Sequence, residues 1–430
     1  MYPPYAYNPL AINPGMAPAA DRIMPLRLLI RQGGTGGYLL FLVNPLNLIV
    51  TRGRTEGYDS VDGSAMIQIV YAMVCFLFAV HHLISRQNGE AVRILFRSPV
   101  AFFLLYTVFC GISALWSPNP KYSAFMAFQC LAFLLLTVVI ISDLCRRSSP
   151  QEVIEWIVLW VLWTVFWAVV VNIRTWGLGY LKYPFQAGVL STGVPFFIAL
   201  HLCRRRAFAW ITMCFAILSV ANTNYFGILP AALLGAILGD RKSKVIAAAI
   251  VVVAGVGVLY FGLEAVIQNT LFFGKEGVGW EHTTGRDKVW KMGWELCMEK
   301  PVLGYGFVAG ERDILYQTRG PGIISMHSMF FSAFIGVGFL GPILLSLYLA
   351  GTTMLCLSPY LAPAWRFSFI ATVFMVVVVS MAGPGLGGRV YGSWQACLLV
   401  MTAIVVSCKS MPSTANGVTH MGPLDAVRRP

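Results

Sequence analysis

Twelve apolar runs, separated by short charged clusters, constrain the fold of this 430-residue chain more than any other feature of its sequence. A helix needs about 20 apolar residues to cross a bilayer, and within lipid its backbone satisfies its own hydrogen bonds. The runs lie at residues 37–50, 64–84, 99–116, 122–142, 153–173, 187–203, 207–221, 225–239, 243–262, 328–357, 365–384 and 392–408. The sequence therefore predicts an all-α polytopic membrane protein with about twelve transmembrane helices.

Two of these runs depart from a simple span. The run 37–50 is short and contains Asn44, Pro45 and Asn47, whereas the run 328–357 is long enough to tilt or to include a re-entrant turn. Composition supports the membrane class, because 11% of the residues are charged and a soluble protein carries about 25%. The first 25 residues are Pro-rich and lack the apolar stretch of a signal peptide, so we expect a flexible tail there.

The placement of Lys and Arg predicts the orientation of the chain. With both termini in the cytoplasm, the cytoplasmic segments hold 18 of these residues, the short outer loops hold 6, and the remaining 7 lie in the long hydrophilic stretch 263–327. This bias follows the positive-inside rule and accounts for the net charge of +13 without nucleic acid as a partner. The predicted segments are a cytoplasmic tail at 1–36, spans 1–9 within 37–262, an extracytoplasmic loop at 263–327, spans 10–12 within 328–408, and a cytoplasmic tail at 409–430.

The long hydrophilic stretch is the candidate functional segment. Thr284 and Asp287 form a variant capping box and Pro301 is a stop signal, so we expect a helix between them. Its helical spacing places Trp290, Trp294 and Cys297 on one face and pairs Lys291 with Glu295 across a turn of the polar face. Periodicity alone is equally consistent with an amphipathic helix that lies on the membrane surface.

His327 lies where this stretch returns to the membrane, at the start of the run 328–357. A histidine at such a place is either a solvated residue at a helix start or a titratable group that accepts a proton near neutral pH. Position alone leaves both roles open.

The motif formed by these residues resembles the O-antigen ligase and Wzy-type polymerase superfamily, with the nearest resemblance to its exopolysaccharide polymerase (ExoQ-like) branch. The order is TGR-x3-W, then P-x-LGYGF, then a histidine 20 residues later followed by Gly-x2-Gly. The matching residues are Gly285, Arg286, Trp290, Pro301, Gly304, Gly306, His327, Ser328, Phe331, Gly338 and Gly341. The predicted topology, with a long outer loop late in the chain, extends the resemblance to the whole sequence.

The resemblance implies a GT-C-like membrane glycosyltransferase of the bacterial inner (cytoplasmic) membrane. Such an enzyme takes a glycan from undecaprenyl pyrophosphate and joins it to another carrier-linked repeat, as a polymerase, or to a lipid A core sugar, as a ligase. The family implies no cofactor and no metal. Expected partners are the lipid-linked glycan, membrane lipid, a flippase, and chain-length regulator or export proteins. The resemblance gives His327 and Arg286 catalytic roles.

One departure from the family pattern concerns the charge that faces the pyrophosphate. The family carries an arginine at the outer start of a mid-chain span, where this chain reads NTNYFG at 222–227. Because guanidinium groups stabilise a phosphate leaving group best, we expect Arg286, Arg174 and Arg389 to supply the charge. Arg52, Arg54 and Lys182 are more distant candidates, and each of these cations could instead be a solvated loop charge.

The remaining candidates concern the acceptor and the sugar. His327 is the expected general base or acceptor-positioning group, with Glu281, His282, Asp287 and Glu311 in reserve. We expect LGYGF and the Trp-containing helix to form a lid over a lipid-facing cleft, with Trp290, Trp294 or Tyr305 stacking on sugar rings. The alternative is that these aromatic residues anchor the loop at the membrane interface. A secondary transporter is the main alternative of another class, but intramembrane charges and related halves are not evident. A scaffold without catalysis is the third possibility.

Overall fold

The computed structural model describes residues 25–52, 63–85, 89–176, 195–218, 286–319, 328–382, 385–388 and 392–410, together with Met326 and single residues between 228 and 256. The elements named in these ranges are all helical. They are α1 (Leu26–Gln32), α2 (Gly34–Arg52), α3 (Gly63–Ile84), α4 (Gly89–Arg97), α5 (Val100–Ile112), η2 (Ser113–Trp116), α6 (Pro120–Arg147), α7 (Pro150–Trp176), α9 (Phe196–Leu202), α10 (Arg206–Leu218), α14 (Arg286–Glu299), α15 (Ala309–Arg319), α16 (Met329–Val337), α17 (Leu340–Cys356), α18 (Pro363–Ala382), η4 (Gly385–Gly387) and α19 (Gly392–Ser410).

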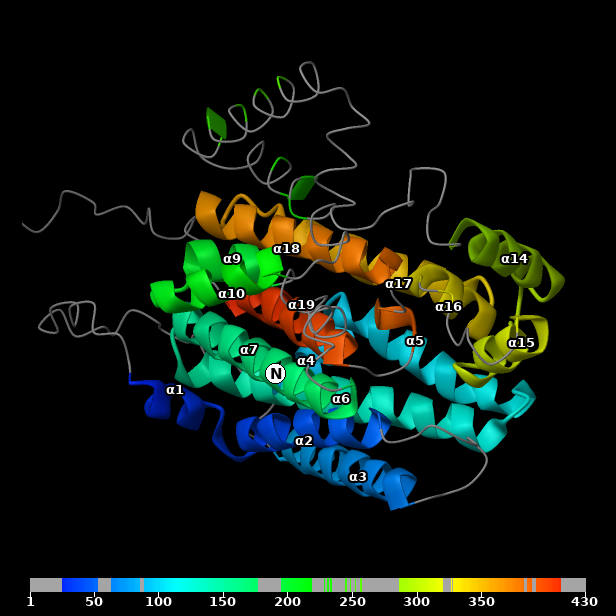
Figure 1. Ribbon diagram of the computed structural model, residues 1–430. Coiled ribbons are helices and arrows are strands. Elements are labelled where there is room, and N and C mark those ends of the chain that lie inside the picture. Colours follow the sequence, from blue (N-terminus) through cyan, green and yellow to red (C-terminus); the bar gives the residue numbers. More distant parts are fainter. Residues whose placement is uncertain are drawn as a thin grey trace, which may run out of the picture.

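The long helices form one bundle with α6 near its centre (Figure 1). Helix α6 packs against α3, α5 and α19, while α7 packs against α2 and α19. Of the residues in the most apolar stretch of α6, 78% are buried within the protein, but in the corresponding stretch of α3 only 28% are buried. Helix α6 is therefore a core element, and α3 leaves an apolar surface that suits contact with lipid.

Local signals at the helix ends account for where the central helices begin. Asn119 caps α6 by accepting a hydrogen bond of 3.1 Å from the Tyr122 N–H, and Pro120 occupies the first helical position. At the start of α7, the Ser149 N–H donates to Glu152 Oε2 at 2.8 Å, and the Glu152 N–H donates to Ser149 Oγ at 3.4 Å. This reciprocal capping box satisfies two backbone donors that the helix leaves unpaired.

Most of the predicted apolar runs coincide with helices. Helices α2, α3, α5, α6, α7, α10, α18 and α19 lie on predicted runs, α9 is the described part of the run 187–203, and the runs 225–239 and 243–262 lie largely outside the described residues. By length and composition, four described helices could cross a membrane. The pair α4 and α5, bent by 77°, would add a fifth if it is one span. The protein is thus a multi-pass membrane protein whose described elements are all helical, and the count of twelve spans stays a prediction.

The run 328–357 is two helices rather than one. Helix α16 ends at Val337, and α17 begins at Leu340. Gly338 separates them with a φ of 68°, a conformation that only glycine adopts readily. The turn that this run was long enough to contain is therefore present, and its position is set by a glycine of the motif.

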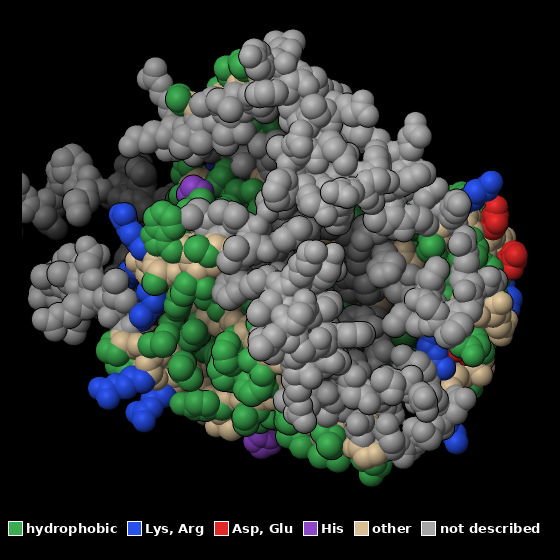
Figure 2. Space-filling view, viewed as in Figure 1, with side chains coloured by type: hydrophobic (Ala, Val, Ile, Leu, Met, Phe, Trp, Pro, Cys, Tyr) green, Lys and Arg blue, Asp and Glu red, His purple; other side chains and the backbone are tan. Residues whose placement is uncertain are grey.

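Helices α14 and α15 pack against α16 at one end of the bundle, and the turn between α9 and α10 lies at the other (Figure 1). The helix expected between Thr284 and Pro301 is confirmed as α14, although Thr284 itself lies outside the described residues. Helix α15 was not predicted. Figure 2 shows apolar side chains over much of the described surface and Lys and Arg at its margins, as expected for a protein surrounded by lipid.

Candidate active site

The site is built around the segment 301–307, which contains LGYGF and is called the strap below. The Tyr305 N–H donates to the Ile335 carbonyl at 2.6 Å, and the Gly306 N–H donates to the Gly336 carbonyl at 3.0 Å. These carbonyls belong to the last turn of α16, where a helix leaves its acceptors unsatisfied. The strap therefore completes the end of α16 with main-chain donors.

Two motif glycines permit this close approach. Gly304 and Gly338 have φ values of 64° and 68°. A Cβ atom on Gly338 would lie 2.1 Å from the Val302 carbonyl oxygen, and one on Gly304 would lie 2.5 Å from the Ile335 carbonyl oxygen. The spacing of glycines in the motif is thus a packing requirement between the strap and α16.

The opposite side of the strap is attached to η2 and α6. The Phe307 N–H donates to Ser113 Oγ at 2.9 Å, and Ser123 Oγ donates to the Phe307 carbonyl at 2.6 Å. Trp116 Nε1 donates to the Leu303 carbonyl at 2.9 Å. Because it is bonded on both sides, the strap is a fixed wall in this structure. A cavity of about 330 Å³ beside it is lined by Trp116, Lys300, Pro301, Val302, Leu303 and Gly304.

Helix α14 packs on α16 through a face that includes Val289, Gly293 and Cys297, all of which are buried. Trp290 flanks this face: its Nε1 donates to the Met326 carbonyl at 3.0 Å, and its ring is stacked 6.3 Å from Phe331. Trp294, expected on the same face, is displaced further around the helix and is 54% exposed.

The expected pairing of Lys291 with Glu295 is wrong. Both side chains are exposed, and no ion pair joins them in the described part of the chain. A solvated pair of this kind gains too little to overcome the entropy of ordering two long side chains.

Glu311 of α15 is the buried acid of this site. It is 5% exposed, and its Oε1 accepts hydrogen bonds from the Met326 N–H at 2.6 Å and from Ser332 Oγ at 2.9 Å. Burial, and secondarily the charge of Glu311, raise the pKa of the Cys297 thiol to about 12. Sequence analysis named Glu311 only as a reserve candidate for the base, because no apolar periodicity indicated a packed helix at the position of α15.

Tyr305 lies at the outer edge of the strap. Its hydroxyl donates to Glu299 Oε2 at 2.6 Å, and Lys300 Nζ lies 4.5 Å from the centre of its ring. Desolvation, followed by the hydrogen bond to Glu299, raises the pKa of Tyr305 to about 12. The phenol is therefore neutral at physiological pH and is a hydrogen-bond donor rather than a base.

The predicted catalytic residues are only partly within the described region. His327 and Arg389 lie outside it, while Arg286 is the first residue of α14 and Arg174 lies in the last turn of α7, both with side chains outside the described part. Helix α7 packs mainly against α2, α9 and α19, away from α14 and α16.

The described neighbours of three of these residues converge at the start of α16. Trp290, one turn after Arg286, is bonded to Met326, which precedes His327. Gly387, two residues before Arg389, is so close to α16 that a Cβ atom on it would lie 2.0 Å from the Met329 carbonyl oxygen. The Tyr106 hydroxyl holds Gly387 from the other side by donating to its carbonyl at 2.7 Å.

In sequence, the segments that adjoin these described residues contain Arg286, His327 and Arg389, whose side chains lie outside the described part of the chain. Two guanidinium groups and an imidazole suit a reaction that releases a phosphorylated leaving group and takes a proton from a hydroxyl. Among the described residues, no three His, Cys, Asp or Glu side chains gather as metal ligands would.

Comparison with known proteins gives one family match. No curated protein matches the chain. Residues 207–346, about a third of the chain, match the family model Wzy_C, described as O-antigen ligase. The matched range contains α14, the strap, α15 and α16, and so includes Arg286, Glu311 and His327. This part of the chain is therefore similar to the O-antigen ligase family.

Proposed function

We propose that this protein is a membrane glycosyltransferase that joins undecaprenyl-pyrophosphate-linked oligosaccharide repeats outside the cytoplasmic membrane. The observation that carries the proposal is that α14, Met326 and η4 meet at the start of α16. The match to the O-antigen ligase family covers the first two of these elements. The resemblance to exopolysaccharide polymerases favours polymerisation of repeats.

In the proposed mechanism, Arg286 and Arg389 stabilise the negative charge that develops on the pyrophosphate as it leaves the sugar. Guanidinium groups bind phosphate oxygens in bidentate fashion and so substitute for a metal ion. Arg174 is the further candidate cation, although its helix packs elsewhere. The reaction needs no cofactor.

His327 accepts the proton of the acceptor hydroxyl or positions that hydroxyl. Its chain neighbour Met326 is held through both main-chain polar atoms, since Glu311 accepts from its N–H and Trp290 Nε1 donates to its carbonyl. Such fixation supports a preorganised base, because general base catalysis depends on hydrogen-bond geometry to the substrate. Tyr305 and the exposed ring of Trp294 are the aromatic candidates for stacking on sugars.

Burial of charge favours this enzyme class over a secondary transporter. Among the described residues, the buried acids are Glu155 and Glu311, and no buried Lys or Arg is present. Glu155 lies near the start of α7 and Glu311 lies in α15, so neither is midway along a membrane-spanning helix. Transporters instead place ionisable residues near the bilayer midplane. A ligase that transfers glycan to lipid A core is the second candidate, in keeping with the description of the matched family.

The test is a deletion strain, complemented with variants and scored on a gel for surface glycan. Loss of long chains with single repeats retained supports a polymerase. Loss of all glycan on lipid A core with carrier-linked polymer accumulating supports the ligase. An unchanged glycan profile with altered uptake of a small solute would overturn both. A polymerase assignment would also lead us to expect a flippase and a chain-length regulator or export protein as partners.

Complementation with Arg286→Ala and His327→Ala tests the site. Loss of the general base His327 should cost about 10²–10⁴-fold, and loss of one group that stabilises the leaving charge about 10²–10³-fold. We therefore expect both variants to insert normally and to yield almost no long chains. Lys291→Ala is the matched control, because Lys291 lies on the exposed side of the same helix. Full output from His327→Ala would remove the proposed base.

A further inference from the structure

A second cavity lies at the end of the bundle away from α14 and α15, between the end of α9 and the first turns of α10 (Figure 1). Its volume is about 450 Å³, and its lining residues are Leu200, Cys203, Arg204, Arg206, Ala209 and Trp210. Nothing in the proposed reaction uses it. Two arginines on one cavity raise the question of which ligand they face.

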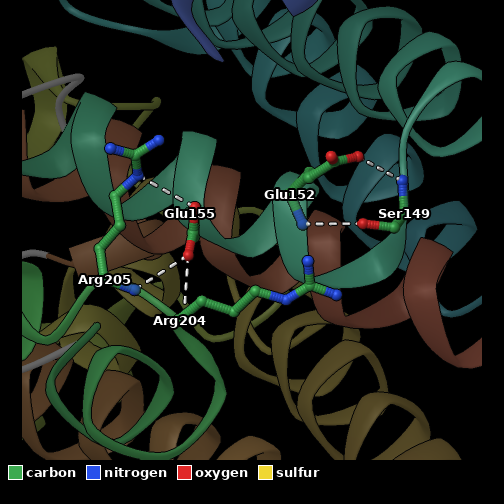
Figure 3. A network of polar contacts seen from close by, with 5 residues as sticks. All are labelled: Ser149, Glu152, Glu155, Arg204 and Arg205. Carbon is green, nitrogen blue, oxygen red and sulfur yellow. Dashed lines mark hydrogen bonds and ion pairs between the residues drawn. The ribbon is translucent and has the colours of Figure 1, made fainter. Parts of the chain in front are cut away.

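The cavity is formed by a turn that a buried acid holds in place. Glu155 of α7 is 3% exposed, and its Oε1 accepts from the Arg204 N–H at 2.8 Å and from the Arg205 N–H at 3.1 Å. Its Oε2 forms an ion pair with Arg205 Nε at 3.1 Å. Figure 3 shows this network beside the capping box at the start of α7, with the side chains of Arg204 and Arg205 extending in different directions.

Glu155 thus neutralises the charge of Arg205 but forms no ion pair with the guanidinium groups of Arg204 and Arg206. Arg204 and Arg206 are exposed, and no ion pair joins either to a carboxylate in the described part of the chain. The first turn of α10 carries no acidic residue, and the positive end of its helix dipole adds to the positive electrostatic potential at the cavity. Two guanidinium groups on one cavity complement a phosphate, which they bind through paired N–H donors.

The other walls of the cavity are apolar. Trp210 on α10 is 61% exposed and Leu200 on α9 is 46% exposed. Tryptophan is favoured at the headgroup level, where its ring contacts lipid and its N–H remains near water. Cations at the edge of an apolar, aromatic wall fit a phosphate that is attached to a lipid.

We propose that this cavity binds the phosphate headgroup of an anionic membrane lipid, with Arg204 and Arg206 on the phosphate and Trp210 and Leu200 against the adjoining ester and acyl region. The site is independent of the glycosyltransferase proposal, because it lies at the other end of the bundle. Lipid bound there would fix the α9–α10 turn against the headgroup layer.

The test measures quenching of Trp210 by brominated lipid in nanodiscs that contain the full-length protein. Subtracting the fluorescence of a Trp210→Phe variant isolates the Trp210 signal from the other tryptophans. Nanodiscs with brominated phosphatidylglycerol are compared with brominated phosphatidylcholine. Each basic residue near a membrane contributes about 1 kcal/mol to binding of anionic lipid, so the Arg204→Gln/Arg206→Gln double variant should lose about tenfold or more of the preference.

Arg31→Gln is the control, since Arg31 is an exposed arginine on α1 that does not line the cavity. It should keep the wild-type preference. Equal quenching by the two lipids in the wild-type protein would overturn the proposal, as would loss of preference in Arg31→Gln to the same extent as in the double variant. Inorganic phosphate that abolishes the preference at millimolar concentration would show a free-phosphate site and would overturn the lipid assignment. Thermal unfolding of each variant confirms that a lost preference does not reflect a lost fold.

Discussion

At the scale of single residues, Gly338 shows that the sequence motif serves the architecture as well as the chemistry. It has a positive φ, and a Cβ atom there would overlap the Val302 carbonyl oxygen at 2.1 Å. The left-handed conformation alone costs a non-glycine residue about 1–2 kcal/mol. We expect Gly338→Ala to lose more than this, because the strap must also move, and to lower the midpoint of thermal unfolding in detergent by several degrees.

Gly34 provides the matched control for this prediction. Its φ is 56°, but a Cβ atom on it would have no neighbour within 4 Å. Gly34→Ala therefore carries the conformational cost without the overlap. Equal losses of stability in the two variants would show that the strap contact at Gly338 is unimportant.

Glu311 gives a second prediction at this scale. Glu311→Ala leaves the Met326 N–H and the Ser332 hydroxyl without their carboxylate acceptor, and each unsatisfied buried group costs about 1–3 kcal/mol. Glu311→Gln keeps an acceptor oxygen of similar position. We expect the alanine variant to have a clearly lower unfolding midpoint and little glycan output, and the glutamine variant to retain most of both.

The comparison of the two variants separates geometry from charge. If Glu311→Gln is as stable as wild type but as inactive as Glu311→Ala, the negative charge itself is required and fixation of Met326 is not the main role. Unfolding midpoints and gel profiles from the same membrane preparations decide between these outcomes.

At the scale of elements, local signals predicted helices better than they predicted how helices meet. The stop signal at Pro301 predicted where a helix ends, and α14 ends at Glu299. The break at Gly338 was harder to place, because its partner Val302 lies in a distant segment of the chain. Helix α15 was missed because its buried side includes a charged residue, Glu311, which an apolar-periodicity argument counts as exposed.

The packing of α14 against α16 can be tested by a pair of tryptophan substitutions. Trp290→Phe keeps an aromatic ring near Phe331 but removes the N–H that donates to the Met326 carbonyl, whereas Trp294 is largely exposed. A net hydrogen bond contributes about 0.5–1.5 kcal/mol. We expect Trp290→Phe to reduce both glycan output and stability modestly.

Trp294→Phe should leave stability unchanged, and its effect on glycan output reports on sugar stacking alone. A loss of stability in Trp294→Phe that exceeds the loss in Trp290→Phe would contradict the arrangement of α14. Measuring unfolding and output in the same preparations keeps the two contributions apart.

At the scale of the whole molecule, sequence determined the class and the candidate residues, while packing determined which of them meet. The apolar runs predicted a multi-pass helical protein from composition and length. They could not show that η4 contacts the start of α16, because Gly387 and Met329 are far apart in sequence and their contact depends on how helices fold together. For the same reason the sequence could place Arg174 beside Arg286 as a further outer cation, but their helices pack against different neighbours.

The predicted orientation places α14 and α15 outside the cytoplasm and the turn between α6 and α7 inside it. Two exposed positions at opposite ends of the bundle test this: Val302 is 74% exposed on the strap, and the Arg147 side chain is 62% exposed at the end of α6. A Cys214→Ser background removes the exposed native thiol. In that background, Val302→Cys should react with a membrane-impermeant maleimide in cells whose outer membrane is permeabilised, whereas Arg147→Cys should react only after lysis.

Lys and Arg retained on the cytoplasmic side are the physical cause of this asymmetry. The reverse pattern would place the strap in the cytoplasm, away from a glycan presented on the outer face, and would remove the basis of the glycosyltransferase proposal.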